Sequence, residues 1–153
     1  MADSQSIRGT AAFVGVGLAG IGAAPGYSHL DLIGLAVHEA LRDAGVKLAD
    51  IDGLFTANMA NILPTLVVGE YLGIRPVVAV GTNTGGNSFV DHVLWAAMAL
   101  QAGLCKVALV CYGSKQGTGK SAPPDMPTDD APYNPREPIS SYAMAAARHM
   151  HDY

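Results

Sequence analysis

The sequence predicts an α/β fold with a mostly parallel central sheet. Short apolar runs typical of strands alternate with helix-like segments over residues 11–112. Half of the 153 residues are hydrophobic and only 14% are charged, a composition typical of a sheet buried between helices. Because strand–helix–strand alternation requires crossover connections, we expect parallel strands joined by right-handed crossovers.

The expected elements follow from apolar periodicity and from residues that begin or end helices. Four strands are expected, at residues 11–18, 52–58, 76–82 and 106–112. Three helices should connect them, at residues 28–44, 63–72 and 88–102. Ser28 is a good N-cap, and Gly45 and Gly73 follow helices at the position that favours glycine. The third helix is nearly apolar throughout, so we expect it to be buried on most sides.

The composition changes after residue 113. Residues 114–138 hold six of the nine prolines, which predicts a long surface loop, and a last helix is expected at residues 139–153. We therefore divide the chain into an α/β domain, residues 1–115, and a loop with the start of another domain, residues 116–153. The last helix has no C-terminal signal, so we expect the first part of a larger protein or one chain of a split assembly.

Charge and cysteine content exclude several function classes. The net charge is −4 and basic residues form no cluster, so nucleic acid is not an expected partner. The polar start of the chain does not resemble a secretion signal, and no apolar run is long enough for a membrane span. Cys105 and Cys111 lie on one expected strand, where they cannot easily bridge, so we expect buried, unreactive thiols. A cytoplasmic location is expected.

Two glycine-rich segments match nucleotide-binding motifs only in part. Residues 15–20 have the glycine spacing of a dinucleotide fingerprint, but a loop follows where that fingerprint needs a helix. Residues 117–121 resemble a phosphate-binding loop, but Ser114 stands where its first glycine is required. We favour a closely packed glycine-rich strand and a surface loop, and we keep a dehydrogenase-type nucleotide binder as the disfavoured alternative.

A strand-to-helix corner at residues 77–88 is the expected functional site. Its backbone N–H groups at Gly85, Gly86, Asn87 and Ser88 would lie at a helix start, where they form an anion or oxyanion site. The corner contains no cysteine, and Ser88 supplies the hydroxyl at the helix start. The corner therefore predicts chemistry without a thiol nucleophile.

Two side chains one turn into this helix carry alternative roles. Asp91 shares a helix face with Asn87 and Ser88. It either forms a capping box with Ser88 or acts as a catalytic acid or base. His92 is expected to be a core or interface histidine with a satisfied ring. The remaining histidines lack ligand spacing, so no metal site is expected.

Four stretches resemble the N-terminal part of a thiolase, in the branch of sterol-carrier-protein-type thiolases and related lipid-transfer proteins. They are residues 13–17, 36–52, the corner with residues 102–110, and residues 142–153. The resemblance implies a thiolase-like βαβαβαβ half-domain, followed by a long loop and the first helix of an inserted loop domain. When Asn83 and Ser88 are matched to the family's asparagine and serine, Gly86 stands where the family has its nucleophilic cysteine.

The resemblance also implies an activity. Cysteine-less relatives of thiolases include aldolases that cleave β-hydroxyacyl-CoA side chains in bacterial steroid breakdown. We therefore expect an acyl-CoA carbon–carbon lyase, or an acyltransferase, for a bulky lipid or steroid thioester, with Gly86 making room. Coenzyme A would enter as part of the substrate, with no other cofactor. The alternative is a non-catalytic acyl-CoA or lipid-binding scaffold, or a partner subunit of a thiolase-like complex.

Further expectations concern binding residues and partners. Asn83 and Gly85 would bind substrate at the corner, and Tyr142 and Met144 match positions that line the family's acyl-pantetheine channel. The general base would come from a second half of the protein. The family's third strand pairs across a two-fold axis, so a homodimer is expected through residues 77–80, with an accessory chain as a further partner.

Overall fold

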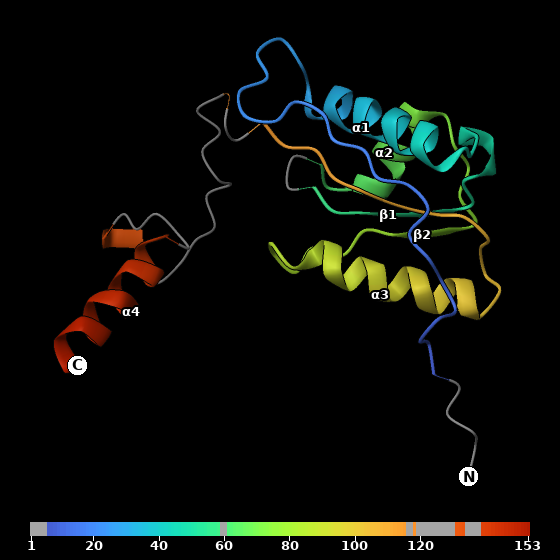
Figure 1. The fold of residues 1–153 in the computed structure, drawn as a ribbon. Coiled ribbons are helices and arrows are strands. Elements are labelled where there is room, and N and C mark those ends of the chain that lie inside the picture. Colours follow the sequence, from blue (N-terminus) through green and yellow to red (C-terminus); the bar gives the residue numbers. More distant parts are fainter. Residues whose placement is uncertain (1–5, 59–60, 116–117, 119–130, 134–138) are drawn as a thin grey trace. The chain divides into compact units, whose positions relative to one another are not determined.

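The computed structural model describes residues 6–58, 61–115, 118, 131–133 and 139–153 (Figure 1). They belong to two compact units, residues 1–121 and 122–153, and each is described by itself. The expected domain boundary after residue 115 stays a prediction. The first unit contains α1 (His29–Ala44), a short 3-10 helix (Leu48–Asp50), β1 (Gly53–Thr56), α2 (Pro64–Leu72), β2 (Val78–Val80), α3 (Ser88–Gln101) and β3 (Ala108–Cys111).

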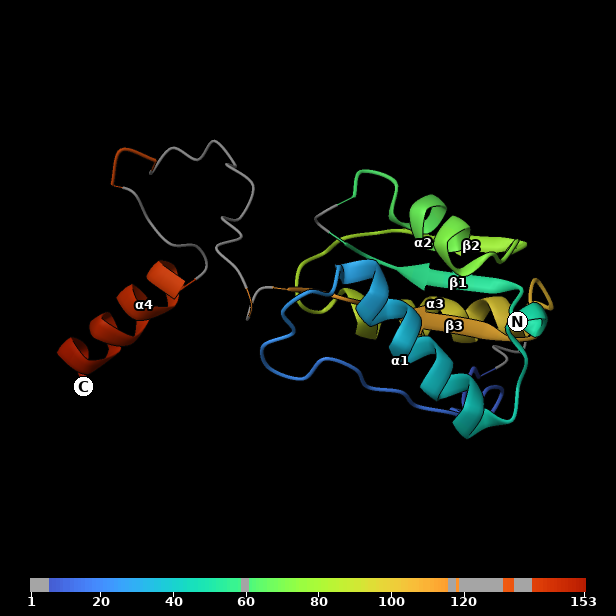
Figure 2. The ribbon, with the colours of Figure 1, turned by 90° about the horizontal axis from the view of Figure 1, so that it is seen from above.

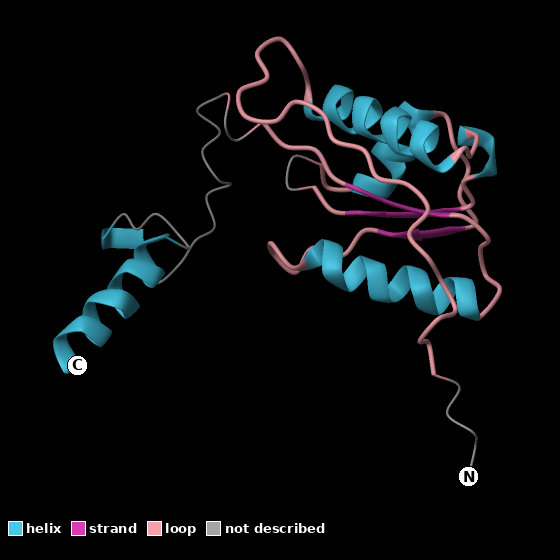
Figure 3. Cartoon of the chain, viewed as in Figure 1, coloured by secondary structure: helices cyan, strands magenta, loops and turns pink. Residues whose placement is uncertain are grey.

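The three strands form one parallel sheet in the order β2-β1-β3 (Figure 2). Helices α1 and α2 cover one face and α3 covers the other, so the sheet is the middle of three layers (Figures 1 and 3). Neighbouring residues of β1 point to opposite faces: Leu54 packs with Ile33 and Val68, whereas Phe55 packs under α3. The predicted α/β class with parallel strands is confirmed.

The predicted ends of α1 and α2 are confirmed. The Ser28 hydroxyl accepts a hydrogen bond from the Asp31 N–H at 3.0 Å, and the Asp31 carboxylate accepts one from the Ser28 N–H at 2.7 Å. This capping box satisfies two N–H groups that a helix start leaves free. Gly45 and Gly73 end the helices with φ of 66° and 70°, a left-handed conformation that glycine adopts without strain.

The strand predicted at residues 11–18 is wrong in the described structure. This segment is extended but pairs with no described strand; instead the Val16 N–H donates to the Asp43 carboxylate at 2.9 Å, and the Leu18 N–H donates to Glu39 at 2.7 Å. A Cβ atom on Gly15 or Gly17 would collide with the backbone of α1. The close packing predicted for these glycines is therefore confirmed, but a helix, not a strand, lies beside them.

The burial predicted for the third helix is also wrong. Only one face of α3 is buried against the sheet, by Ser88, His92, Ala96 and Ala99. The opposite face exposes large apolar side chains, those of Val90, Leu94, Trp95 and Met98. The apolar sequence concealed this asymmetry because both faces of the helix carry hydrophobic residues.

The second unit contains α4 (Ile139–Asp152) at the position predicted for the last helix. A short 3-10 helix, Ala131–Tyr133, precedes it. Most of the loop predicted at residues 114–138 lies outside the described residues. None of the helices in the described part of the chain combines the length and the apolar character that crossing a membrane requires.

Candidate active site

The corner lies between the end of β2 and the start of α3, at the carboxyl edge of the parallel sheet (Figures 1 and 2). Ligands of open α/β folds bind at this edge, because the loops that follow the strands meet there. Residues 81–87 connect β2 to α3, and residues 57–58 follow β1 at the same edge. The sequence-predicted residues from Asn83 to Asp91 are thus brought together by this connection.

Ser88 is fully buried, and its hydroxyl hydrogen-bonds to the loop that precedes α3. Its hydroxyl accepts a hydrogen bond from the Thr84 N–H at 2.9 Å and donates one to the Gly85 carbonyl at 2.6 Å. The Ser88 N–H also donates to the Gly85 carbonyl, at 3.2 Å. This N–H is therefore engaged within the turn, and its expected part in an anion site stays a prediction. The Ser88 hydroxyl stabilises the loop and is not a free nucleophile.

The capping box predicted between Ser88 and Asp91 is wrong. Helix α3 begins at Ser88, with Asn87 as the N-cap residue, and no side chain caps it. The Asp91 carboxylate instead accepts hydrogen bonds from the Thr84 hydroxyl at 2.7 Å and from the Asn87 side-chain amide at 3.1 Å. Asp91 thus ties the incoming loop to the first turn of the helix. Its role as a catalytic acid or base stays a prediction.

Backbone N–H groups on either side of the Ser88 N–H remain available at the helix start. The Gly85 N–H donates to the Asn83 side-chain oxygen at 3.1 Å, in a turn that gives Gly85 a φ of 91°. Within the described part of the chain, the N–H groups of Gly86 and Asn87 have no hydrogen-bond partner. Because α3 directs the positive end of its dipole here, this pair is suited to binding a developing negative charge.

Gly86 faces open space. A Cβ atom built on it meets no atom within 4 Å, and its backbone does not lie in the left-handed region. No local packing or backbone strain therefore requires glycine at this position. The absence of a side chain leaves volume beside the N–H groups of Gly86 and Asn87.

His92 anchors α3 beneath the corner. Its ring is fully buried, as predicted for a core histidine, and it packs edge-on against Phe89 at a centroid distance of 5.9 Å. The Nε2 atom lies 3.1 Å from both the hydroxyl and the carbonyl oxygen of Thr82. The Nδ1 atom has no partner among the described residues, so only one ring nitrogen is satisfied, not both as the sequence suggested.

Neither cysteine lies at the corner. Cys105 is buried beside Phe55 under α3, and Cys111 is partly buried at the end of β3. Burial raises the pKa of the Cys105 thiol, and it raises the pKa of the Cys111 thiol to about 11. Both thiols are therefore protonated near neutral pH and are poor nucleophiles. They are free, as the sequence predicts.

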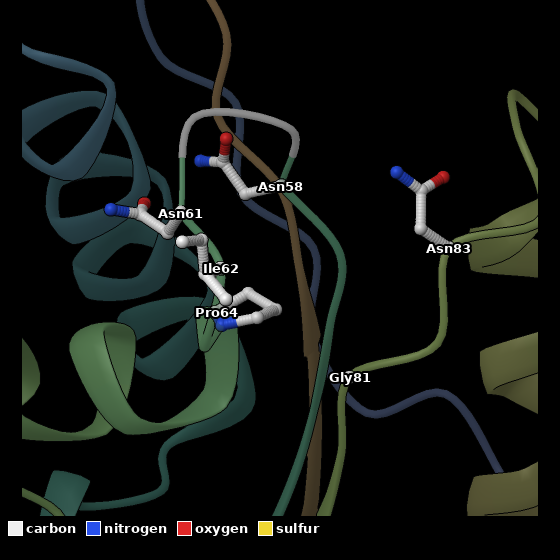
Figure 4. Close-up of a pocket in the computed structure, with 6 residues that line it drawn as sticks. All are labelled: Asn58, Asn61, Ile62, Pro64, Gly81 and Asn83. Carbon is white, nitrogen blue, oxygen red and sulfur yellow. The ribbon is translucent and has the colours of Figure 1, made fainter. Parts of the chain in front are cut away.

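A pocket of about 270 Å³ adjoins the corner (Figure 4). It is lined by Asn58, Asn61, Ile62, Pro64, Gly81 and Asn83. The His29 ring nitrogen Nε2 lies 2.8 Å from the side-chain oxygen of Asn61 and orients that amide. The sequence interpretation missed Asn58 and Asn61. The signal was present, because Asn58 follows a buried strand at the edge where ligands bind.

Tyr142 and Met144 lie on α4, in the second unit. Their side chains are 70% and 74% exposed. Two residues apart on a helix, they point to different sides and do not form one contact surface. Their part in binding an acyl-pantetheine group stays a prediction.

Comparison with known proteins finds relatives that are similar in sequence and fold. No family model matches the sequence. The chain is 32% identical to a steroid side-chain-cleaving aldolase of Thermomonospora curvata, over 96% of this chain and 41% of that protein. It is 29% identical to 17-hydroxy-3-oxo-4-pregnene-20-carboxyl-CoA lyase of Mycobacterium tuberculosis, over 95% of this chain and again 41% of the other. The chain thus spans about two fifths of the length of these relatives.

Solved structures agree. A structure named Ltp2-ChsH2(DUF35) aldolase matches 92% of this chain and 37% of that chain, with a TM-score of 0.74 and 28% identity. A monomeric SCP2-thiolase-like protein type 1 of Mycobacterium smegmatis matches 60% of this chain and 20% of that chain, with a TM-score of 0.50 and 25% identity. The parallel sheet and its strand-to-helix corner therefore define a thiolase-like α/β protein. Within that class, the chain is similar to proteins of the sterol-carrier-protein-type branch, and its corner carries no cysteine.

Proposed function

We propose that the protein is an acyl-CoA carbon–carbon lyase that cleaves a β-hydroxyacyl-CoA by a retro-aldol reaction. One observation carries the proposal: the corner offers the unpartnered N–H groups of Gly86 and Asn87 but no thiol. An oxyanion can be stabilised there, whereas a covalent acyl-enzyme cannot form there through cysteine. The names of the relatives support a steroid side-chain thioester as the substrate.

The proposed reaction conserves every atom of the substrate. A base removes the proton of the β-hydroxyl group, the bond between Cα and Cβ breaks, and a carbonyl forms at Cβ. The bonding electrons become a thioester enolate, whose oxygen accepts hydrogen bonds from the Gly86 and Asn87 N–H groups. A proton then returns to Cα and yields the shortened acyl-CoA. We place the base outside residues 1–153, because the aldolase relatives are more than twice as long as the matched region.

Cofactor, partners and location complete the proposal. Coenzyme A enters as part of the substrate, and we propose no other cofactor. A homodimer would pair along β2, an edge strand of the described sheet whose neighbour Val77 is largely exposed. An accessory chain is supported by the name of the Ltp2-ChsH2(DUF35) structure, which joins two proteins. We propose that the assembly works in the cytoplasm.

The proposal is tested by incubating the protein with a β-hydroxyacyl-CoA that carries a steroid side chain. Mass spectrometry should detect a free ketone or aldehyde together with the shortened acyl-CoA. The assay is run with the protein alone and with a co-expressed accessory chain. Tight binding of the thioester without product in either arm would contradict the lyase and favour the non-catalytic acyl-CoA scaffold.

A further inference from the structure

The pocket beside the corner has features of a substrate subsite. It opens between the residues that follow β1 and those that follow β2, and Asn83 is part of both the pocket wall and the corner (Figure 4). All six residues that line it are uncharged, and three of them are asparagines. Asn83 therefore connects the corner to the pocket wall.

The turn at the corner fixes the orientation of the Asn83 amide. Its side-chain oxygen accepts the Gly85 N–H at 3.1 Å and lies 3.5 Å from the Ser88 hydroxyl. The amide nitrogen must therefore point the other way. Figure 4 shows this nitrogen on the side of Asn83 that faces Asn58, with the oxygen directed away. The corner thus presents a hydrogen-bond donor to the pocket.

The lining indicates the class of group that fits. A neutral amide donor matches an acceptor oxygen, such as a carbonyl or hydroxyl, whereas phosphates and carboxylates are usually bound by arginine or lysine. Ile62, which is 98% exposed, and Pro64 supply apolar contacts around that oxygen. With a volume of about 270 Å³, the pocket accommodates part of a bulky ligand.

We propose that the Asn83 amide nitrogen donates a hydrogen bond to the oxygen on the carbon β to the thioester. This inference rests on the proposed function. In the retro-aldol step that oxygen begins as a hydroxyl, loses its proton to the base and ends as the carbonyl of the leaving ketone or aldehyde. An amide donor stabilises the oxygen as its charge builds up, while the Gly86 and Asn87 N–H groups bind the enolate oxygen.

The test compares the binding of two thioesters that differ only at the β carbon. 3-Oxooctanoyl-CoA carries an acceptor oxygen there and cannot undergo retro-aldol cleavage, and octanoyl-CoA lacks that oxygen. One hydrogen bond corresponds to roughly tenfold tighter binding of the 3-oxo compound by the wild-type protein. Asn83→Asp keeps an acceptor for the Gly85 N–H but removes the donor. The variant should therefore bind the two thioesters with about equal dissociation constants. Isothermal titration calorimetry measures both dissociation constants.

Controls separate the possible failures. Gln101→Glu adds the same charge at the far end of α3 and should keep the tenfold preference. If Asn83→Asp does not fold, Asn83→Ser replaces it, because the serine oxygen can still accept the turn hydrogen bond but its side chain is shorter. An unchanged preference in the Asn83 variant, or equal wild-type affinities, overturns the role of Asn83 and leaves the lyase standing. A wild-type protein that binds neither thioester contradicts the proposed function itself.

Discussion

The His92 Nε2 atom lies 3.1 Å from both the carbonyl and the hydroxyl oxygen of Thr82, and thereby joins the first turns of α3 to the end of β2. Ser88, one turn earlier, and Asp91, the residue before His92, both bind Thr84. Three side chains of one helix thus reach back to the loop that enters it. This arrangement holds the corner in shape before any ligand arrives, which is the condition for effective oxyanion stabilisation.

Loss of the His92 contact should destabilise the fold. His92→Phe keeps most of the ring volume but leaves the Thr82 oxygens without their partner, so the free energy of unfolding should fall by about 1–3 kcal/mol. His92→Gln retains an amide donor and should recover part of that loss. Urea denaturation measures both variants. Equal stability of His92→Phe and the wild type would show that the contact contributes nothing.

The oxyanion role of the Asn87 N–H can be separated from that of its side chain. Asn87→Pro removes the N–H, and proline is compatible with the φ of −83° at this helix start. Asn87→Ala removes the same side-chain contact with Asp91 but keeps the N–H. The proline variant should lose about 10²–10³ in kcat relative to the alanine variant, as is typical for one oxyanion donor. Steady-state kinetics with the β-hydroxyacyl-CoA measures kcat for both variants. Equal kcat values would contradict the oxyanion role of the Asn87 N–H.

Restoring a thiol at the corner should not create a thiolase. Gly86→Cys meets no steric obstacle, so the variant should fold with a free energy of unfolding within about 0.5 kcal/mol of the wild type. Thiolytic cleavage also needs both an acid and a base placed for that reaction, and a thiol at Gly86 supplies neither. The assay supplies a β-ketoacyl-CoA with free coenzyme A. Production of two acyl-CoA molecules by the variant would refute this account.

The contact between α1 and α2 should produce a stability change in acid. The Tyr71 hydroxyl donates to the Asp31 carboxylate at 2.7 Å and, with the hydrogen bonds from Ser28, lowers the pKa of Asp31 from 3.8 to about 2. A folded-state pKa below the unfolded value stabilises the fold above about pH 4, and this contribution disappears as the pH falls towards 2. Tyr71→Phe removes the hydrogen bond that contributes most to the lowered pKa of Asp31.

The melting temperature of Tyr71→Phe should therefore lie below that of the wild type near pH 7, by a small amount because the pair is exposed. The difference should narrow as the pH falls from about 4 to 2. Thermal denaturation followed by circular dichroism across this range provides the measurement. A difference that stays constant with pH would mean that Tyr71 acts only through packing.

Local signals predicted the fold better than they predicted the site. Ser28, Gly45 and Gly73 mark helix ends through their own side-chain or backbone chemistry, so their roles are visible in a few neighbouring residues. The segment at residues 11–18 was misassigned because its N–H groups bind carboxylates of Asp43 and Glu39, which are distant in sequence. An apolar extended pattern does not reveal which element lies beside it.

The sequence also predicted the candidate site only in part. Because α3 begins at Ser88, Asn87 is the N-cap residue, and Asp91 contacts Thr84 and Asn87 instead of forming the predicted capping box with Ser88. The pocket was missed because it combines residues after β1 with Asn83 after β2, which only the parallel pairing of these strands brings together. The corner itself was predictable, because one continuous segment forms it.

The central claim is that the corner stabilises an enolate and forms no acyl-enzyme. Cleavage of the β-hydroxyacyl-CoA in D₂O tests it most directly, with mass spectrometry of both the shortened acyl-CoA and the intact protein. The account predicts one deuterium at Cα of the product and an unmodified protein mass throughout turnover. A covalent acyl adduct on the protein, or a product without deuterium at Cα, would contradict it.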